Sequence, residues 1–112
     1  MNAQYGLSVE SISKIKEVFA RYPAVDKAVL YGSRAKGTER PGSDIDLVLF
    51  GSELDQAKLD KILSDLDDLL LPYQTDVSIF SRISHPDLLD HISRIGVTFY
   101  DKTALGITDR KN

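Results

Sequence analysis

Three aspartates are the residues of this sequence whose type and spacing most directly suggest chemistry. Asp44 and Asp46 stand two apart in the segment SDIDL at 43–47, and Asp76 lies thirty residues beyond Asp46. Residues two apart on a β-strand leave the same face, and Asp76 alternates with apolar neighbours in the same way. If the two strands are neighbours in one sheet, the three carboxylates converge on one face of it.

Clustered carboxylates repel one another, and a cation offsets that repulsion. Hard oxygen ligands favour Mg²⁺, with Mn²⁺ as the alternative, and waters and substrate phosphates complete the shell. Two such ions about 3.5–4 Å apart can stabilise both the attacking and the leaving oxygen of a phosphoryl transfer. Asp44, Asp46 and Asp76 are therefore the candidate catalytic residues and metal ligands.

The alternative is that these aspartates are solvated strand residues. Asp is common beside turns, which suits Asp44 at a strand start. It is depleted within strands, however, and Asp46 lies inside the apolar run at 45–50. This position favours a functional role for Asp46.

The glycine–serine pair at 32–33 is the second candidate site. It follows an apolar stretch and precedes a helical turn, so free backbone N–H groups at the start of that turn could bind phosphate. Gly32 permits close backbone approach or a positive φ. The Ser33 hydroxyl adds a donor, and Arg34 and Lys36 could add cationic contacts. The alternative is an ordinary strand–turn–helix connection with a capping serine.

The apolar periodicity predicts the elements that must position these residues. In order, we expect a helix over 9–22, a strand over 25–31, a helical turn over 33–36, a strand over 44–50, a helix over 59–70, a strand over 75–80, a helix over 88–95 and a strand over 97–100. The fold class is α+β, a two-layer arrangement in which a mixed sheet of about four strands carries helices on one face.

Polar residues and glycines mark the expected helix ends. Ser8 is the predicted N-cap of the first helix. Ser52 and Asp55 resemble a capping box before the second long helix, and Ser84 and Asp87 bracket the start of the last one. Gly96 suits the position just after that last helix.

Composition limits the possible classes of protein. The 112 residues fit one domain, and the absence of cysteine excludes disulfides and thiolate metal sites. With neither a signal peptide nor an apolar run of membrane length in the sequence, we expect a cytoplasmic protein. The net charge of −3, with both signs scattered, argues against direct binding of nucleic acid over a broad surface.

Other motifs fail on spacing. Thr38 stands where the lysine of a P-loop would be. An EF-hand would need an oxygen ligand at Val48 and a glycine at Leu49. His85 and His91 are six apart, a poor pair for zinc, and are more typical of cap and surface positions.

The segments GSRAKG at 32–37 and SDIDL at 43–47, followed by Asp76, resemble the signature of the DNA polymerase beta superfamily of nucleotidyltransferases. That signature is Gly-Ser, about ten residues, Asp-x-Asp and a later third carboxylate, and here ten residues separate Ser33 from Asp44. By its small size, the chain resembles the minimal nucleotidyltransferase (MNT) group. The resemblance implies a nucleotidyltransferase fold in a single domain over 1–112, with a motif core at about 25–80. The polar residues after the last strand predict a flexible tail at 103–112.

The resemblance also implies roles for the candidate residues. Gly32 and Ser33 would contact the triphosphate, and Asp44 and Asp46 would bind both metal ions. Asp76 would be a further metal ligand that can accept the acceptor's proton. Arg34 matches the arginine of the family's usual pattern. Lys36 replaces its second arginine, which keeps the charge but loses the bidentate fork.

Members of the MNT group often act with a small HEPN-domain protein, in pairs that resemble toxin–antitoxin systems. The resemblance therefore implies transfer of a nucleoside monophosphate, AMP from ATP by preference, to a hydroxyl on such a partner. Two alternatives stay open. One is a non-catalytic, antitoxin-like module that neutralises a partner by contact, and the other is a structural domain with coincidental motifs.

Overall fold

The structure, a computed structural model, describes residues 4–103. Its elements are α1 (Val9–Ala20), β1 (Lys27–Tyr31), α2 (Gly32–Lys36), β2 (Ile45–Phe50), α3 (Gln56–Asp67), β3 (Thr75–Ile79), the 3₁₀ turn η1 (Phe80–Arg82), α4 (Pro86–Ile95) and β4 (Val97–Asp101). This order confirms the predicted succession. The tail expected at 103–112 falls, apart from Thr103, outside the described residues.

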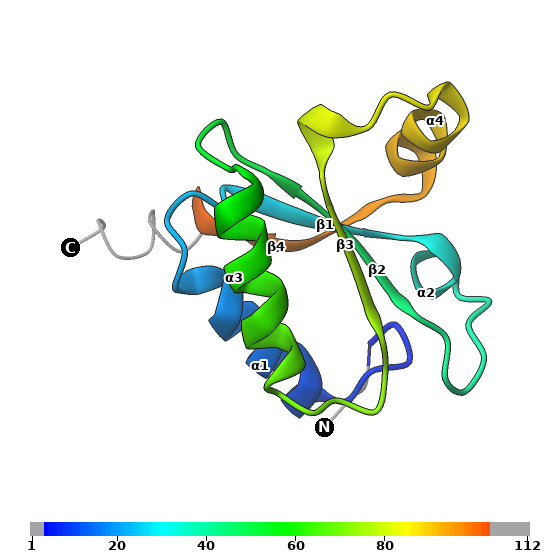
Figure 1. The fold of residues 1–112 in the computed structure, drawn as a ribbon. Coiled ribbons are helices and arrows are strands. Elements are labelled where there is room, and N and C mark those ends of the chain that lie inside the picture. Colours follow the sequence, from blue (N-terminus) through cyan, green and yellow to red (C-terminus); the bar gives the residue numbers. More distant parts are fainter. Residues whose placement is uncertain (1–3, 104–112) are drawn as a thin grey trace.

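The four strands form one mixed sheet in the order β3-β2-β1-β4. β1 pairs antiparallel with β2 and with β4, and β2 pairs parallel with β3. The parallel pair is connected through α3, which crosses over one face of the sheet (Figure 1). The predicted mixed sheet of four strands and the α+β class are confirmed.

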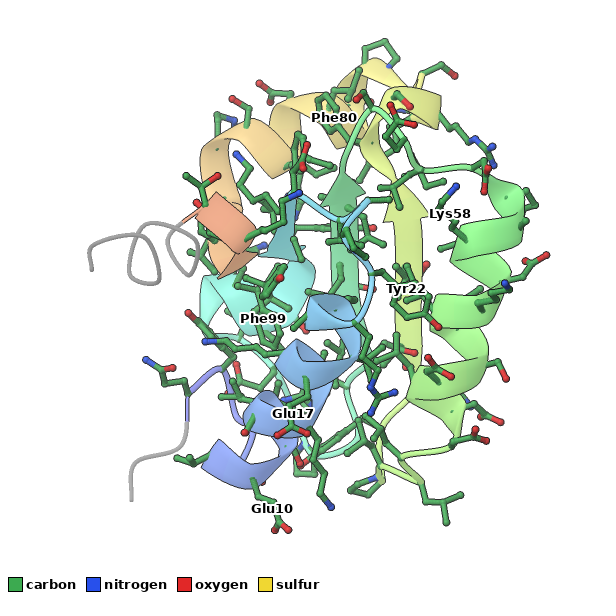
Figure 2. The ribbon with its side chains drawn as sticks, turned by 90° about the vertical axis from the view of Figure 1, so that its left-hand side faces the viewer. Glu10, Glu17, Tyr22, Lys58, Phe80 and Phe99 are labelled. Atoms are coloured by element: carbon green, nitrogen blue, oxygen red, sulfur yellow. The ribbon has the colours of Figure 1, made fainter. Side chains whose placement is uncertain are left out.

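One face of the sheet is largely apolar and lies under α1 and α3 (Figure 1). Its strand residues alternate with those of the opposite face, as the sequence pattern predicted: Ala28, Leu30, Ile45, Leu47, Leu49, Val77 and Ile79. Phe99 of β4 (Figure 2) meets Phe19 of α1 edge-on, with ring centroids 6.4 Å apart. The Tyr22 hydroxyl donates to the Asp65 carboxylate and so joins the end of α1 to α3 (Figure 2).

The opposite face carries a smaller apolar cluster, and α4 covers it (Figure 1). Val29, Tyr31 and Val48 are buried there against Ile92 of α4. The expectation that all helices pack on one face therefore holds for α1 and α3 but not for α4. The reason is that the middle of this face is apolar and needs its own cover.

The helix ends differ in detail from the prediction. Ser8 caps α1 as expected, its hydroxyl accepting from Ser11 N at 3.0 Å. α3 is capped by Asp55 itself, whose carboxylate accepts from Lys58 N at 2.9 Å, and not by Ser52. The α3 helix also stops earlier than predicted, at Asp67.

The last helix, α4, is capped by His85, whose Nδ1 accepts from Asp87 N at 3.2 Å. Its first residue is Pro86, a position where the missing N–H costs nothing. Gly96 follows the helix with φ −60° and ψ 143°, which is not left-handed. Within residues 4–103, no helix is both long and apolar enough to cross a membrane.

Candidate active site

Asp46 and Asp76 lie side by side on the α4 side of the sheet. β2 and β3 run parallel in a register that pairs Asp46 directly with Asp76. On its other side, Asp46 is paired with Tyr31, the last residue of β1. The condition set by the sequence pattern, that the two strands be neighbours, is therefore met.

The environment of Asp46 disfavours its negative charge. Burial is the largest cause that raises the pKa of Asp46 above its usual value, followed by the charges of Asp76 and Asp44. His91 and Arg34 lower the pKa of Asp46, but by less. The Tyr31 pKa is also raised, first by burial and then by Asp76 and Asp46. The carboxylates thus interact at short range.

Asp44 precedes β2 and is exposed, as is Asp76, whereas Asp46 is half-buried. In the part of the chain from 4 to 103, no three carboxylate or imidazole groups are gathered so that they could hold a metal ion by themselves. Mg²⁺ is usually held by one or two carboxylates together with substrate phosphates and waters. The paired Asp46 and Asp76, whose repulsion a cation would relieve, fit that kind of partial site.

The backbone of Gly32 comes against the Asp46 carboxylate. Gly32 has φ +78°, a left-handed conformation that disfavours side chains. A Cβ atom built there would lie 2.3 Å from Asp46 Oδ2, so the carboxylate would have to turn away from its present position. The left-handed φ and the close carboxylate both favour glycine at this position, and the positive φ is one of the two reasons that the sequence suggested.

Ser33 and Lys36 lie on α2, the short helix that begins at Gly32. Ser33 is partly exposed near the start of this helix, next to Gly32. Lys36 is exposed at its last residue. Both side chains are therefore accessible from solvent on the element that follows the turn, and their proposed contacts with a nucleotide stay predictions.

Arg34, for which the sequence predicted a cationic contact with the nucleotide, makes contacts within the protein. Its side chain is only 3% exposed, and its contact with a nucleotide stays a prediction. Nε and Nη2 donate to the Ser43 carbonyl at 3.2 and 2.7 Å, and Nη1 donates to the Tyr5 carbonyl at 2.8 Å. The guanidinium also lies over the Tyr73 ring, 4.7 Å from its centroid. Arg34 holds the residue just before Asp44 in place, which is a positioning role.

His91 is a site residue that the sequence interpretation missed. It was expected at the surface, yet it is half-buried, and its Nε2 accepts from the Gly32 N–H at 3.1 Å. Its ring meets that of Tyr31 edge-on, with centroids 6.1 Å apart. A signal was present in the sequence: His91 lies three residues after Leu88 and next to Ile92, on the apolar stripe of α4.

A family model described as "Polymerase beta, Nucleotidyltransferase" matches residues 13–104. The chain belongs to this nucleotidyltransferase family. The match spans the glycine–serine turn and all three aspartates of the candidate site. The resemblance drawn from the sequence motifs is thereby confirmed, and with it the class of the protein as a nucleotidyltransferase. No match is found among the curated proteins.

Solved structures share the fold of this nucleotidyltransferase. A toxin–antitoxin complex with AMP-PNP matches with a TM-score of 0.67 and 22% identity, over 80% of this chain and 73% of the other. A tri-AMPylated Shewanella oneidensis HEPN toxin in complex with MNT antitoxin matches with a TM-score of 0.61 and 18% identity, over 82% and 71%. The toxin–antitoxin MntA-HepT matches with a TM-score of 0.63 and 18% identity, over 84% and 73%.

Proposed function

We propose that this nucleotidyltransferase transfers AMP from ATP to a hydroxyl group of a HEPN-domain partner, with Mg²⁺ as cofactor, and so acts as an antitoxin. The observation that carries the proposal is the pairing of Asp46 with Asp76 beside the close approach of Gly32. The family match gives the reaction class. The nucleotide and the partner are suggested by two proteins of the same fold, a toxin–antitoxin with AMP-PNP and an MNT antitoxin in complex with a tri-AMPylated HEPN toxin.

The roles of the residues follow from their positions. Gly32 and Ser33 would bind the triphosphate through backbone N–H groups and the serine hydroxyl. Lys36, exposed on the same short helix, would add positive charge near the phosphates. Asp44, Asp46 and Asp76 would hold the divalent cations, which neutralise phosphate charge and stabilise the attacking and leaving oxygens.

The transfer itself needs one proton acceptor. The acceptor's hydroxyl oxygen attacks the α-phosphorus of ATP, the bond from that phosphorus to the β-phosphate oxygen breaks, and pyrophosphate leaves. Asp76, the exposed carboxylate of the pair, would take the hydroxyl proton. A tyrosine is the expected acceptor residue, since its hydroxyl is the most acidic of the protein hydroxyls.

The position of Asp76 favours an acceptor carried by another macromolecule. β3 is at the edge of the sheet, so Asp76 can be approached from outside along that edge. Among the structural neighbours, one is a tri-AMPylated HEPN toxin bound to its MNT antitoxin. An AMP group on a protein partner is the product that our proposal predicts.

The test is co-expression of the chain with a candidate HEPN partner, followed by transfer from labelled ATP with Mg²⁺. We expect the partner's mass to rise by one AMP or a multiple of it. Asp46→Asn should abolish the increase, whereas Asp60→Asn, an exposed aspartate on α3, should not change it. Label on RNA or free nucleotides with an unmodified partner would contradict the proposed acceptor. A stable complex without modification would favour the contact-only antitoxin.

A further inference from the structure

The backbone N–H of Gly32, which the proposed function assigns to the triphosphate, already has a side-chain acceptor in His91. The Gly32 N–H donates to His91 Nε2 at 3.1 Å, although the two residues are 59 apart in sequence. The nitrogen that accepts this bond carries no proton, so it offers the N–H a lone pair much as a phosphate oxygen would. One N–H cannot serve both partners at full strength.

The contact is built into the fold and is not a chance approach of a surface side chain. α4 is seated on the sheet by Ile92, which is buried against Val29, Tyr31 and Val48. At the end of α4, a Cβ on Gly96 would lie 2.7 Å from Val29 Cγ1, so the helix is in close contact with β1. The Tyr31 ring lies edge-on to the imidazole. α2 and α4 are accordingly on the same side of the sheet (Figure 1).

We infer that His91 is a positioning residue that occupies the Gly32 N–H in the nucleotide-free protein and yields it to a phosphate oxygen when the triphosphate binds. This inference rests on the proposed function. Without an acceptor, the partly buried N–H of a turn packed against Asp46 would lose a protein partner, and part of the cost of an unpaired donor would remain. The bond to His91 avoids that cost and keeps the turn at φ +78°, the conformation in which Gly32 meets Asp46.

The exchange favours the nucleotide because a hydrogen bond to a charged phosphate oxygen is stronger than one to an imidazole nitrogen. The nucleotide's gain in binding free energy is nevertheless reduced, because the hydrogen bond between Gly32 and His91 must be broken first. A variant that lacks the acceptor has no such bond to break, and its Gly32 N–H gains a partner only in the complex. Removal of the acceptor should therefore tighten binding, whereas loss of an ordinary phosphate-binding residue would weaken it.

The experiment measures the dissociation constant of AMP-PNP with Mg²⁺ by calorimetry for the wild type, His91→Leu and His91→Gln. Leucine removes the acceptor, and glutamine keeps an oxygen at about the reach of Nε2. Neither substitute is ever positively charged, so their comparison isolates the hydrogen bond. We expect His91→Leu to bind about 2- to 10-fold more tightly than His91→Gln. His85→Asn, which replaces the histidine that caps α4 with another capping residue, should leave affinity unchanged.

A second measurement needs no variant. The N–H···N contact permits a 15N–15N coupling across the hydrogen bond between Gly32 and His91, which NMR of the labelled wild-type protein can detect. We expect this coupling without nucleotide and its loss on saturation with AMP-PNP and Mg²⁺. A coupling that persists at saturation, or a His91→Leu protein that binds no more tightly than His91→Gln, would overturn the inference alone. A wild-type protein that binds no triphosphate would overturn the proposed function as well.

Discussion

On β2, Asp46 and Leu47 are neighbours in sequence and lie on opposite faces of the sheet. Leu47 is fully buried between the sheet and the layer of α1 and α3, together with Ile45 and Leu49. Asp46 shares its face with Val48, which is buried under α4, and with the carboxylate of Asp76. The same backbone therefore supplies apolar burial on one side and clustered negative charge on the other.

The difference shows how a small domain separates stability from chemistry. The face under α1 and α3 is built mainly from apolar residues of all four strands, so the burial of these residues outweighs the unfavourable repulsion at the charged site. The other face is apolar only in its middle, and its charged end brings Asp46 and Asp76 together in spite of their repulsion. Substitutions of Leu47 and of Asp46 should therefore have opposite effects on stability.

The largest effect on stability is expected from Leu47→Ala. Leu47 is 0% exposed, so its truncation removes apolar contacts and leaves a cavity. We expect a loss of about 2–5 kcal/mol in the free energy of unfolding, measured by urea denaturation. A loss below about 1 kcal/mol would mean that the face under α1 and α3 does not carry most of the stability.

Arg34→Met comes next and tests whether Arg34 belongs to the fold or to the nucleotide site. The variant leaves the Ser43 and Tyr5 carbonyls without their guanidinium donors, and we expect a loss of about 2 kcal/mol in the free energy of unfolding. The dissociation constant of AMP-PNP, measured where the variant is folded, should change little. A large loss of affinity with unchanged stability would restore the phosphate-binding role. Lys36→Ala is the control on the same helix, and its stability should lie within about 0.5 kcal/mol of wild type.

Gly32→Ala should affect the site more than the core. The new Cβ would lie 2.3 Å from Asp46 Oδ2, and a residue with a side chain is disfavoured at φ +78°. We expect a stability loss of about 1–2 kcal/mol and a loss of AMP transfer larger than that of Ser33→Ala, which removes one hydroxyl and leaves the backbone N–H groups. Steady-state kinetics of both variants checks this order. Near-normal transfer by Gly32→Ala would show that the close approach is not required.

The smallest effect has the opposite sign. The pKa of Asp46 is raised by burial, Asp76 and Asp44, so its ionised form destabilises the folded protein when no metal is bound. Asp46→Asn should therefore raise the melting temperature of the metal-free protein at pH 7 by roughly 2–4 °C, the shift that about 0.5 kcal/mol produces in a domain of this size.

The pH dependence follows from the same shift. Between the raised folded-state pKa and the usual value, the folded state binds more protons than the unfolded state, so the Asp46 contribution stabilises the wild type as pH falls through that window. The advantage of Asp46→Asn should shrink over the same range. Thermal unfolding of both proteins with a chelator present, followed from pH 7 downward, measures this. A metal-free Asp46→Asn protein that melts below wild type at pH 7 would contradict the repulsion.

The elements and their faces could be predicted because apolar residues recur with a period of two in strands and of about 3.6 in helices. The alternation at 44–50 placed Asp46 opposite Leu47, and that at 75–79 placed Asp76 opposite Val77. The glycine–serine turn and the spacing to Asp44 were also visible in the sequence. These features depend on residues a few positions apart, so a single sequence contains them in full.

Only the tertiary structure decided where Arg34 and His91 point and which face α4 covers. Arg34 is bonded to Tyr5, 29 residues away, and Gly32 to His91, 59 residues away. No periodic pattern in the sequence indicates either contact, because each depends on how two elements distant in sequence pack together. The sequence by itself thus determined the strands, the carboxylate face and the need for glycine at 32. The packing of α4 against β1 and β2 determined that an imidazole meets that glycine, since burial of Ile92 on Val29 and Val48 fixes the helix there.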